Sequence, residues 1–305
     1  MKIASNDVPT SRPSAAASAW LAAMPLLFVL IWSTGFIVAK YGLPYSPALT
    51  FLLLRFAGVV VILLPLVVLM RAPWPTGRIH HVAVAGILVQ AGYLAGVWCA
   101  IKMGMPAGLS ALIVGMQPIL TAFAAPLVGE RVSGRQWLGL AFGIGGVGLV
   151  VANKMSLIGL SWQSLTLCVL ALLSITAGTL YQKRYCASFD LRTGTLIQFV
   201  ASILVVLPFA VATEGLTPSL DRVHWTPQFI GSLLWSILAL SIGAIFLLFA
   251  LIRTSAATRI SSLMYLTPPT TAVMAWVMFG EAFSMTGIAG MLLAVIGVAL
   301  VISRK

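Results

Sequence analysis

The chain carries very little charge. Asp, Glu, Lys and Arg make up 8% of its 305 residues, whereas hydrophobic residues make up 60%. An ordinary soluble domain has about 25% charged residues, because its surface must face water. So few charged side chains cannot cover a water-soluble surface. The composition therefore excludes a soluble domain and predicts a membrane protein.

Acidic side chains and catalytic motifs are also scarce. All six Asp and Glu residues fall outside the long apolar runs, and the sequence has no HExxH, no GxSxG and no phosphate-binding glycine loop. The three histidines, His80, His81 and His224, lie in or near expected loops. A membrane-embedded enzyme would need catalytic side chains that converge inside the bilayer, so the sequence disfavours one. We expect no catalytic residue, no metal and no cofactor, and no obvious proton relay.

Cysteine is rare and odd in number. Cys99 and Cys168 lie in apolar runs and Cys186 lies in a basic loop, which does not suggest a disulfide framework. Residues 1–18 are polar and rich in Ser, Ala and Pro. We expect them to form a disordered cytoplasmic lead rather than a signal peptide, because no cleavage-type site follows a short apolar core.

Long apolar runs make up most of the remaining chain. A helix of about 20 mostly apolar residues spans the hydrocarbon core of a bilayer, and continuous runs favour helices over the alternating strands of a barrel. The sequence predicts an all-α membrane protein with ten transmembrane helices. Their expected ranges are 20–40, 48–70, 80–100, 107–128, 136–152, 162–182, 193–212, 228–251, 256–279 and 285–302. The longest loop, about 213–227, is too short for a signalling or scaffold domain.

The basic residues predict the orientation of these helices. Of the 18 Lys and Arg residues, 13 fall on the side of the two termini, four fall on the other side and Arg55 lies inside a helix. The four are Lys40, Lys102, Lys154 and Arg222. Because cytoplasmic loops carry the excess of Lys and Arg, we expect an inner-membrane protein with both termini in the cytoplasm. The net charge of +12 is then a topology signal and not a nucleic-acid patch.

The two halves of the chain resemble each other. Lys40 matches Lys183 and Pro65 matches Pro208 at a separation of 143 residues, and Pro118 matches Pro269 and Gly129-Glu130 matches Gly280-Glu281 at 151. We therefore expect a first repeat at 20–152 and a second at 160–302. Since each repeat has five helices, an odd number, the second must be inverted. Inverted repeats allow a transporter to open alternately to either side of the membrane.

The order of several motifs is similar to that of a known family. The first expected helix contains Trp32-Ser33-Thr34-Gly35-Phe36 followed by Lys40, and the second contains Arg55-Phe56. The fourth contains Pro118, an apolar stretch and then Gly129-Glu130, and the fifth has Gly139 and Gly146 seven residues apart. The second half has Pro268-Pro269, Gly280-Glu281, Gly290 and Gly297, but Gln198 replaces the Arg. Over about 20–302 the chain resembles EamA-type permeases of the drug/metabolite transporter superfamily. The resemblance implies two five-helix units and transport of a small molecule, often outward, without naming the substrate.

Arg55 is the most informative single residue. It lies roughly 12 Å below the outer end of its helix, at 1.5 Å per residue, and no acidic residue lies in any expected helix. A charge at this depth is costly and is usually paired or functional. It could attract a substrate carboxylate or phosphate, or it could serve only structure by snorkelling or bonding helix-end carbonyls.

Other residues could form a cavity or a hinge. Proline removes a backbone hydrogen bond and kinks a helix, so Pro118, Pro268 and Pro269 are either gating hinges or static kinks. Polar and aromatic residues near mid-membrane could face a substrate, or could simply serve helix packing. These candidates are Trp32, Ser33, Thr34, Arg55, Gln90, Tyr93, Trp98, Gln117, Trp235, Ser241, Tyr265 and Thr267.

Glycines at helical spacing predict close helix contacts. The faces at Gly139–Gly146 and Gly290–Gly297 could pack within the chain, which we prefer, or form a homodimer contact. Glu130 and Glu281 end helices at the membrane surface, where we expect solvation or bonds to nearby backbone. The sequence as a whole predicts a secondary permease that moves a small metabolite, such as an amino acid or a related amphiphilic compound, by alternating access. Export is the expected direction, and the membrane-embedded enzyme and the signalling or scaffold protein are the alternatives.

Overall fold

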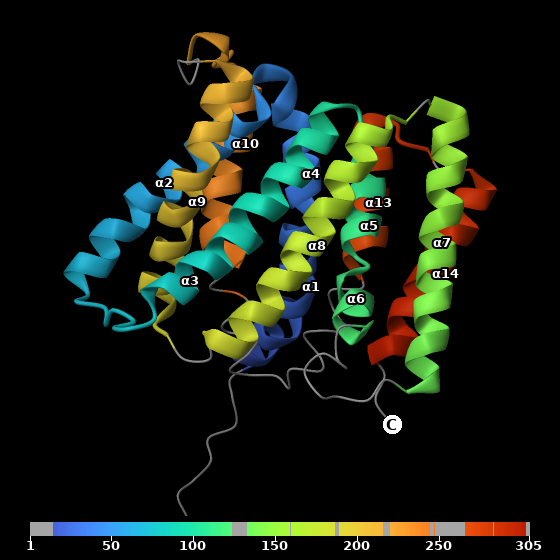
Figure 1. Cartoon of the computed structure of the whole chain (residues 1–305), viewed down its shortest axis with the longest axis horizontal. Helices are drawn as coiled ribbons and strands as arrows, with labels where there is room; N and C mark the ends of the chain where they lie inside the picture. Colours follow the sequence, from blue (N-terminus) through green and yellow to red (C-terminus); the bar gives the residue numbers. More distant parts are fainter. Residues whose placement is uncertain are drawn as a thin grey trace, which may run out of the picture.

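A computed structural model describes residues 15–123, 133–158, 160–186, 189–215, 220–244, 247, 266–282 and 284–302. Within these residues the secondary structure is entirely helical, with no strand (Figure 1). Several expectations lie outside them: Glu130, Tyr265, the first part of the helix expected at 256–279, and the last residues of those expected at 107–128 and 228–251. So do residues 1–14 of the expected lead.

Helices of the first half follow the apolar runs closely. They are α1 (Ala15–Gly42), α2 (Ala48–Leu69), α3 (Ile79–Gly86), the π-helical segment η2 (Ile87–Gly92), α4 (Tyr93–Lys102), α5 (Ala107–Val114), α6 (Gln117–Phe123) and α7 (Gly134–Ile158), with a short 3-10 turn η1 (Leu43–Tyr45) after α1. The segments α3, η2 and α4 form one continuous helix over the range expected at 80–100. The helix expected at 107–128 is instead divided into α5 and α6.

The second half has the same character. It comprises α8 (Trp162–Tyr185), α9 (Leu191–Glu214), the 3-10 turn η4 (Leu220–Arg222), α10 (Pro227–Trp235), the π-helical segment η5 (Ser236–Gly243), α13 (Thr267–Phe279) and α14 (Met285–Ile302). Six described helices are long and apolar enough to cross a membrane, and three shorter apolar helices accompany them. The long ones are Ala23–Tyr45, Ala48–Leu69, Ile79–Lys102, Gly134–Asn153, Trp162–Tyr185 and Leu191–Glu214.

Local sequence explains where several helices begin and end. The hydroxyl of Ser161 accepts from the backbone N–H of Ser164 and starts α8, and Thr226 caps α10 in the same way just before Pro227. Gly280 ends α13 with φ 66°, a left-handed conformation that glycine adopts without steric cost.

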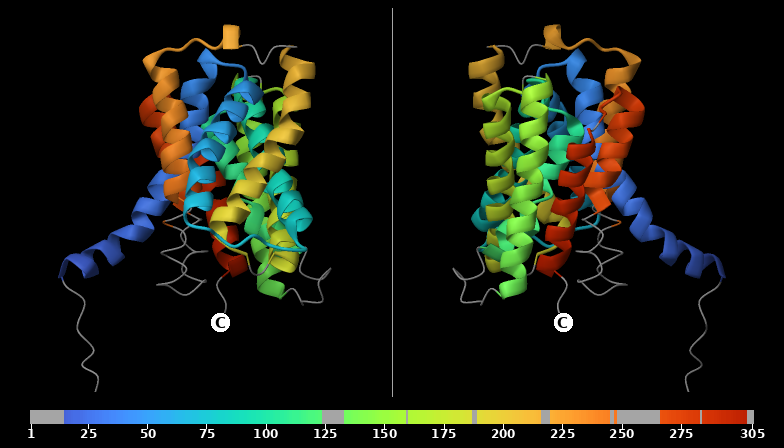
Figure 2. Two further views of the ribbon diagram at one scale, coloured as in Figure 1. Left: turned by 90° about the vertical axis from the view of Figure 1, so that its left-hand side faces the viewer. Right: turned by 90° about the vertical axis from the view of Figure 1, so that its right-hand side faces the viewer.

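The helices pack as a bundle with one pair at its edge. α2 packs on α9 and α4 packs on α8, while α7 and α14 pair along their length at one side of the molecule (Figure 1). The first turns of α1 lean away from the rest (Figure 2). Close backbone approach holds the edge pair together: a Cβ atom on Gly146 would lie 2.4 Å from the carbonyl oxygen of Gly290. The glycine faces at Gly139–Gly146 and Gly290–Gly297 therefore pack against each other within the chain, which is the alternative favoured from the sequence.

The three hinge candidates, Pro118, Pro268 and Pro269, lie at helix starts, whereas Pro25, Pro65 and Pro208 lie inside α1, α2 and α9. α5 ends at Val114, and Pro118 lies in the first turn of α6, where a missing N–H costs no helical bond. Pro268 and Pro269 occupy the first turn of α13. The two sites adjoin each other, because a Cβ atom on Gly115 would lie 2.7 Å from Cγ of Pro268.

Candidate functional site

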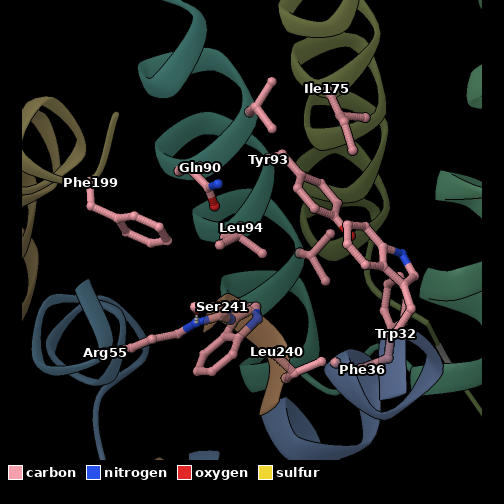
Figure 3. A pocket seen from close by; sticks show the side chains of 14 residues that line it. Trp32, Phe36, Arg55, Gln90, Tyr93, Leu94, Ile175, Phe199, Leu240 and Ser241 are labelled. Atoms are coloured by element: carbon pink, nitrogen blue, oxygen red, sulfur yellow. Dashed lines mark hydrogen bonds between the residues drawn. The ribbon is translucent and has the colours of Figure 1, made fainter. Parts of the chain in front are cut away.

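A cavity lies between helices of both halves of the chain (Figure 3). About 110 Å³ of it is open to the centres of water molecules. Since roughly 10–15 Å³ on this measure holds one water, the cavity has room for a small organic molecule. Its lining comes from α1, α2, η2, α4, α8, α9 and η5: Trp32, Gly35, Phe36, Arg55, Val89, Gln90, Tyr93, Leu94, Val97, Trp98, Ile175, Phe199, Leu240 and Ser241.

Among the described lining residues, Arg55 is the only charged one. Its side chain is buried and points at Ser241 (Figure 3), where Nε donates a 3.1 Å hydrogen bond to the Ser241 hydroxyl. The guanidinium carbon lies 5.7 Å from the centroid of the Trp98 ring. No carboxylate contacts Arg55 in the described chain, and its two Nη atoms have no protein partner there. These two nitrogens therefore offer unused hydrogen-bond donors to a ligand.

Aromatic contacts fix the walls around Arg55. Phe51, behind the lining, meets the ring of Trp98 edge-on, with ring centroids 4.7 Å apart. Phe199, which lines the cavity, packs against Phe56 at 5.4 Å. Because such pairs hold their rings in defined orientations, the cavity has fixed apolar walls beside a single cationic group. This combination suits an amphiphilic ligand.

Both π-helical segments contribute to the lining. η2 supplies Val89 and Gln90, and η5 supplies Leu240 and Ser241. A π turn leaves backbone carbonyls that need other donors, and hydroxyls serve here. Ser174 on α8 donates to the carbonyl of Leu88 at 2.8 Å, and Ser241 donates to that of Ser236 at 2.9 Å. Such segments inside α-helices occur frequently at functional sites.

The cavity brings together six of the residues that the sequence singled out: Trp32, Arg55, Gln90, Tyr93, Trp98 and Ser241. The apolar lining residues Phe36, Phe199 and Leu240 were not predicted from the sequence. The Phe36 position was visible as part of the motif in the first helix, and Phe199 is the counterpart of Phe56 at a separation of 143 residues.

Other candidates lie away from the lining. Trp235 is 45% exposed and donates from Nε1 to the Thr34 hydroxyl at 2.8 Å, while the Gln117 amide donates to Thr179 at 3.1 Å. Ser33 and Thr267 are buried, and their hydroxyl oxygens have no hydrogen-bond partner. Among the described residues no cluster of His, Cys, Asp or Glu could hold a metal ion.

Comparison with known proteins identifies the family. The model of the EamA-like transporter family matches residues 19–152 and again residues 162–303. The chain belongs to the EamA-like transporter family. It is therefore a transporter with several membrane-spanning helices and not an enzyme, as the motif order predicted.

Relatives of this EamA protein include transporters of several bacteria. A "Probable amino-acid metabolite efflux pump" of Salmonella typhimurium is 29% identical over 90% of this chain and 92% of its own length. An "Uncharacterized transporter" of Bacillus subtilis is 26% identical over 91% and 90%. A "Probable terminal-alkyne amino-acid exporter" of Streptantibioticus cattleyicolor is 27% identical over 67% and 66%. One solved crystal structure, 17% identical, covers 92% of this chain and 96% of its own with a TM-score of 0.62, which shows a shared fold.

Proposed function

We propose that the protein exports a small amino-acid-like metabolite across the inner membrane, and that the Arg55 cavity is its substrate site. The observation that carries the proposal is the Arg55 guanidinium. It is buried, its Nε is bonded to Ser241, and its two Nη nitrogens remain without a protein partner in the described chain. A buried cation is costly unless something pairs with it, and a substrate carboxylate would supply both charge and acceptors.

The mechanism we propose is alternating access between two inverted five-helix repeats, with both termini in the cytoplasm. Three observations support it. The family model matches the chain twice. The segments η2 and η5 begin 149 residues apart and end 151 apart, as 236 − 87 and 243 − 92, close to the repeat offset of 151. The cavity is lined from both halves, so that a relative movement of the halves would change the access to it.

The names of the relatives support the proposed substrate class and direction. Two of the three relatives described above are named for efflux or export of amino acids or their metabolites. The proposal needs no second subunit, because residues of a single chain line the cavity. Both a monomer and a homodimer are compatible with it.

Transport in proteoliposomes tests this proposal. Purified protein would be assayed for uptake and efflux against a panel of labelled amino acids and their derivatives. We expect saturable movement of at least one amphiphilic carboxylate, and an Arg55→Gln variant that folds normally should move it at least about tenfold more slowly at low concentration. If no compound moves, or if the variant transports every active compound as well as the wild type does, the proposed site is wrong.

A further inference from the structure

The described residues around the cavity carry charge of one sign only. Arg55 is the single charged group on the part of the lining that the structure describes, which contains no Asp, Glu or His. A free amino acid, by contrast, brings both a carboxylate and an ammonium. The lining thus has a charged partner for one end of such a molecule and none for the other.

The two helix-end glutamates of the described chain cannot supply the missing carboxylate. Glu214 accepts hydrogen bonds from the backbone N–H groups of Leu49 and Thr50, at 2.8 and 2.9 Å. Glu281 is bonded to Lys40 and accepts from the N–H of Ala107 at 3.0 Å. Glu214 is thus held at the start of α2, and Glu281 is held at the start of α5. Neither lines the cavity.

An ammonium in the cavity would therefore meet only neutral groups and a like charge. The faces of Trp32, Tyr93 and Trp98 can attract a cation. That attraction offsets only part of the cost of removing an ammonium from water, and the Arg55 guanidinium opposes it. A carboxylate has no such difficulty, because Arg55 lines the cavity and its Nη donors have no protein partner in the described chain.

We propose that the site selects an amphiphilic monoanion, namely a carboxylate on an apolar or aromatic body whose amino group is absent or acylated, over the zwitterionic amino acid. This inference rests on the proposed function and deepens it. The negative charge of such a substrate would also supply a driving force for export. One net negative charge leaves the cell with each substrate, so an inside-negative membrane potential drives export without a coupling ion. No Asp or Glu lies in any apolar run of the sequence, which accords with a cycle that carries no proton.

Two compounds with the same ring test the selectivity. Proteoliposomes loaded with labelled N-acetyl-L-phenylalanine or L-phenylalanine would be compared for initial efflux rate at low concentration. We expect the acetylated anion to leave at least about tenfold faster, since only the zwitterion must bury an unpaired ammonium. An equal or faster rate for phenylalanine would overturn the inference while leaving the transport function intact. Failure of every compound on the wider panel would instead count against the transport function itself.

Membrane potential tests the driving force. Valinomycin with an outward potassium gradient makes the vesicle interior negative. We expect this potential to accelerate efflux of N-acetyl-L-phenylalanine severalfold relative to vesicles without a gradient. An anion efflux rate that does not respond to the potential would contradict a cycle driven by substrate charge.

A matched pair of arginine variants links the selectivity to the cavity. Arg55→Gln should reduce the preference for the acetylated anion to less than about threefold. Arg71→Gln makes the same chemical change at an exposed position between α2 and α3 and should keep the wild-type ratio. An unchanged ratio in a folded Arg55→Gln protein would overturn the assignment to Arg55. If that variant does not fold, the comparison of the two compounds in the wild type still decides the selectivity.

Discussion

Lys40 and Glu281 form an ion pair across 241 residues of sequence. The pair joins the last turns of α1 to the segment between α13 and α14. The same carboxylate accepts hydrogen bonds from the backbone N–H groups of Ala107 and Gly108, at 3.0 and 3.2 Å, and so fixes the start of α5. One buried side chain thus holds three parts of the bundle together. Bonds of Glu281 to backbone were expected, but its backbone partners lie at the start of a helix distant in the sequence, and the ion pair with Lys40 was not expected.

The Glu281 contacts predict an unequal cost for removing either partner. Glu281→Gln should destabilise the protein by about 1.5–3 kcal/mol, because it weakens charge-assisted bonds to a helix N-terminus as well as the ion pair. Lys40→Met should cost about 1 kcal/mol or less, since the Lys40 side chain is 32% exposed and can be solvated. Unfolding midpoints in detergent would compare the two variants. A larger loss for Lys40→Met would contradict this account of Glu281.

Glycine contacts between α7 and α14 predict a sharp difference between two neighbouring positions. Gly146→Ala should be destabilising by more than about 1 kcal/mol, because its Cβ would meet the Gly290 carbonyl oxygen and the two helices cannot separate without losing contacts. Gly148→Ala is the matched control on the same helix. Its Cβ would meet no heavy atom within 4 Å, so the better helix propensity of alanine should leave stability equal or improved. Equal unfolding midpoints in detergent for Gly146→Ala and Gly148→Ala would show that α7 and α14 are not closely packed.

Ser241 should matter for transport through the position of Arg55. Ser241→Ala removes the acceptor for Arg55 Nε and the donor to the carbonyl of Ser236. We expect KM for a carboxylate substrate to rise about tenfold, because a hydrogen bond to a charged group is worth about 1.5–3 kcal/mol. Ser232→Ala is the control: its hydroxyl bonds only to Gln228 of its own helix and lies away from the cavity. A variant with normal folding and an unchanged KM at Ser241 would argue against its positioning role.

Topology can be tested separately from transport. The excess of Lys and Arg on one side predicts that both termini lie in the cytoplasm. A protease-cleavable tag at either end should therefore be protected in intact spheroplasts and cut after lysis. A tag cut at only one end in intact spheroplasts would rule out two inverted five-helix repeats.

Sequence reasoning found the helices well where apolar runs alone determine them. The range expected at 48–70 matches α2 at Ala48–Leu69 within one residue. The break after Val114 lies where Pro118 predicted a kink or hinge. The π-helical segments were not expected, because they depend on partners distant in the sequence. The Leu88 carbonyl, for example, is satisfied by Ser174, 86 residues away.

The candidate site could be predicted only in part for a related reason. Arg55 stands out as a lone charge in an apolar run, but its bond to Ser241, 186 residues away, follows only from the fold. Phe36, Phe199 and Leu240 were missed because apolar residues that face lipid, core or cavity look alike in a sequence. Conversely, Trp235 and Gln117 were expected near mid-membrane, yet they bond to Thr34 and Thr179 and do not line the cavity.

The most direct test of the substrate site is a structure with a transported carboxylate bound. We predict that the carboxylate lies within hydrogen-bond distance of the Nη atoms of Arg55 and that the apolar part of the ligand lies against Trp98 and Tyr93. A ligand bound elsewhere in the bundle, with Arg55 still unpaired, would contradict the central claim.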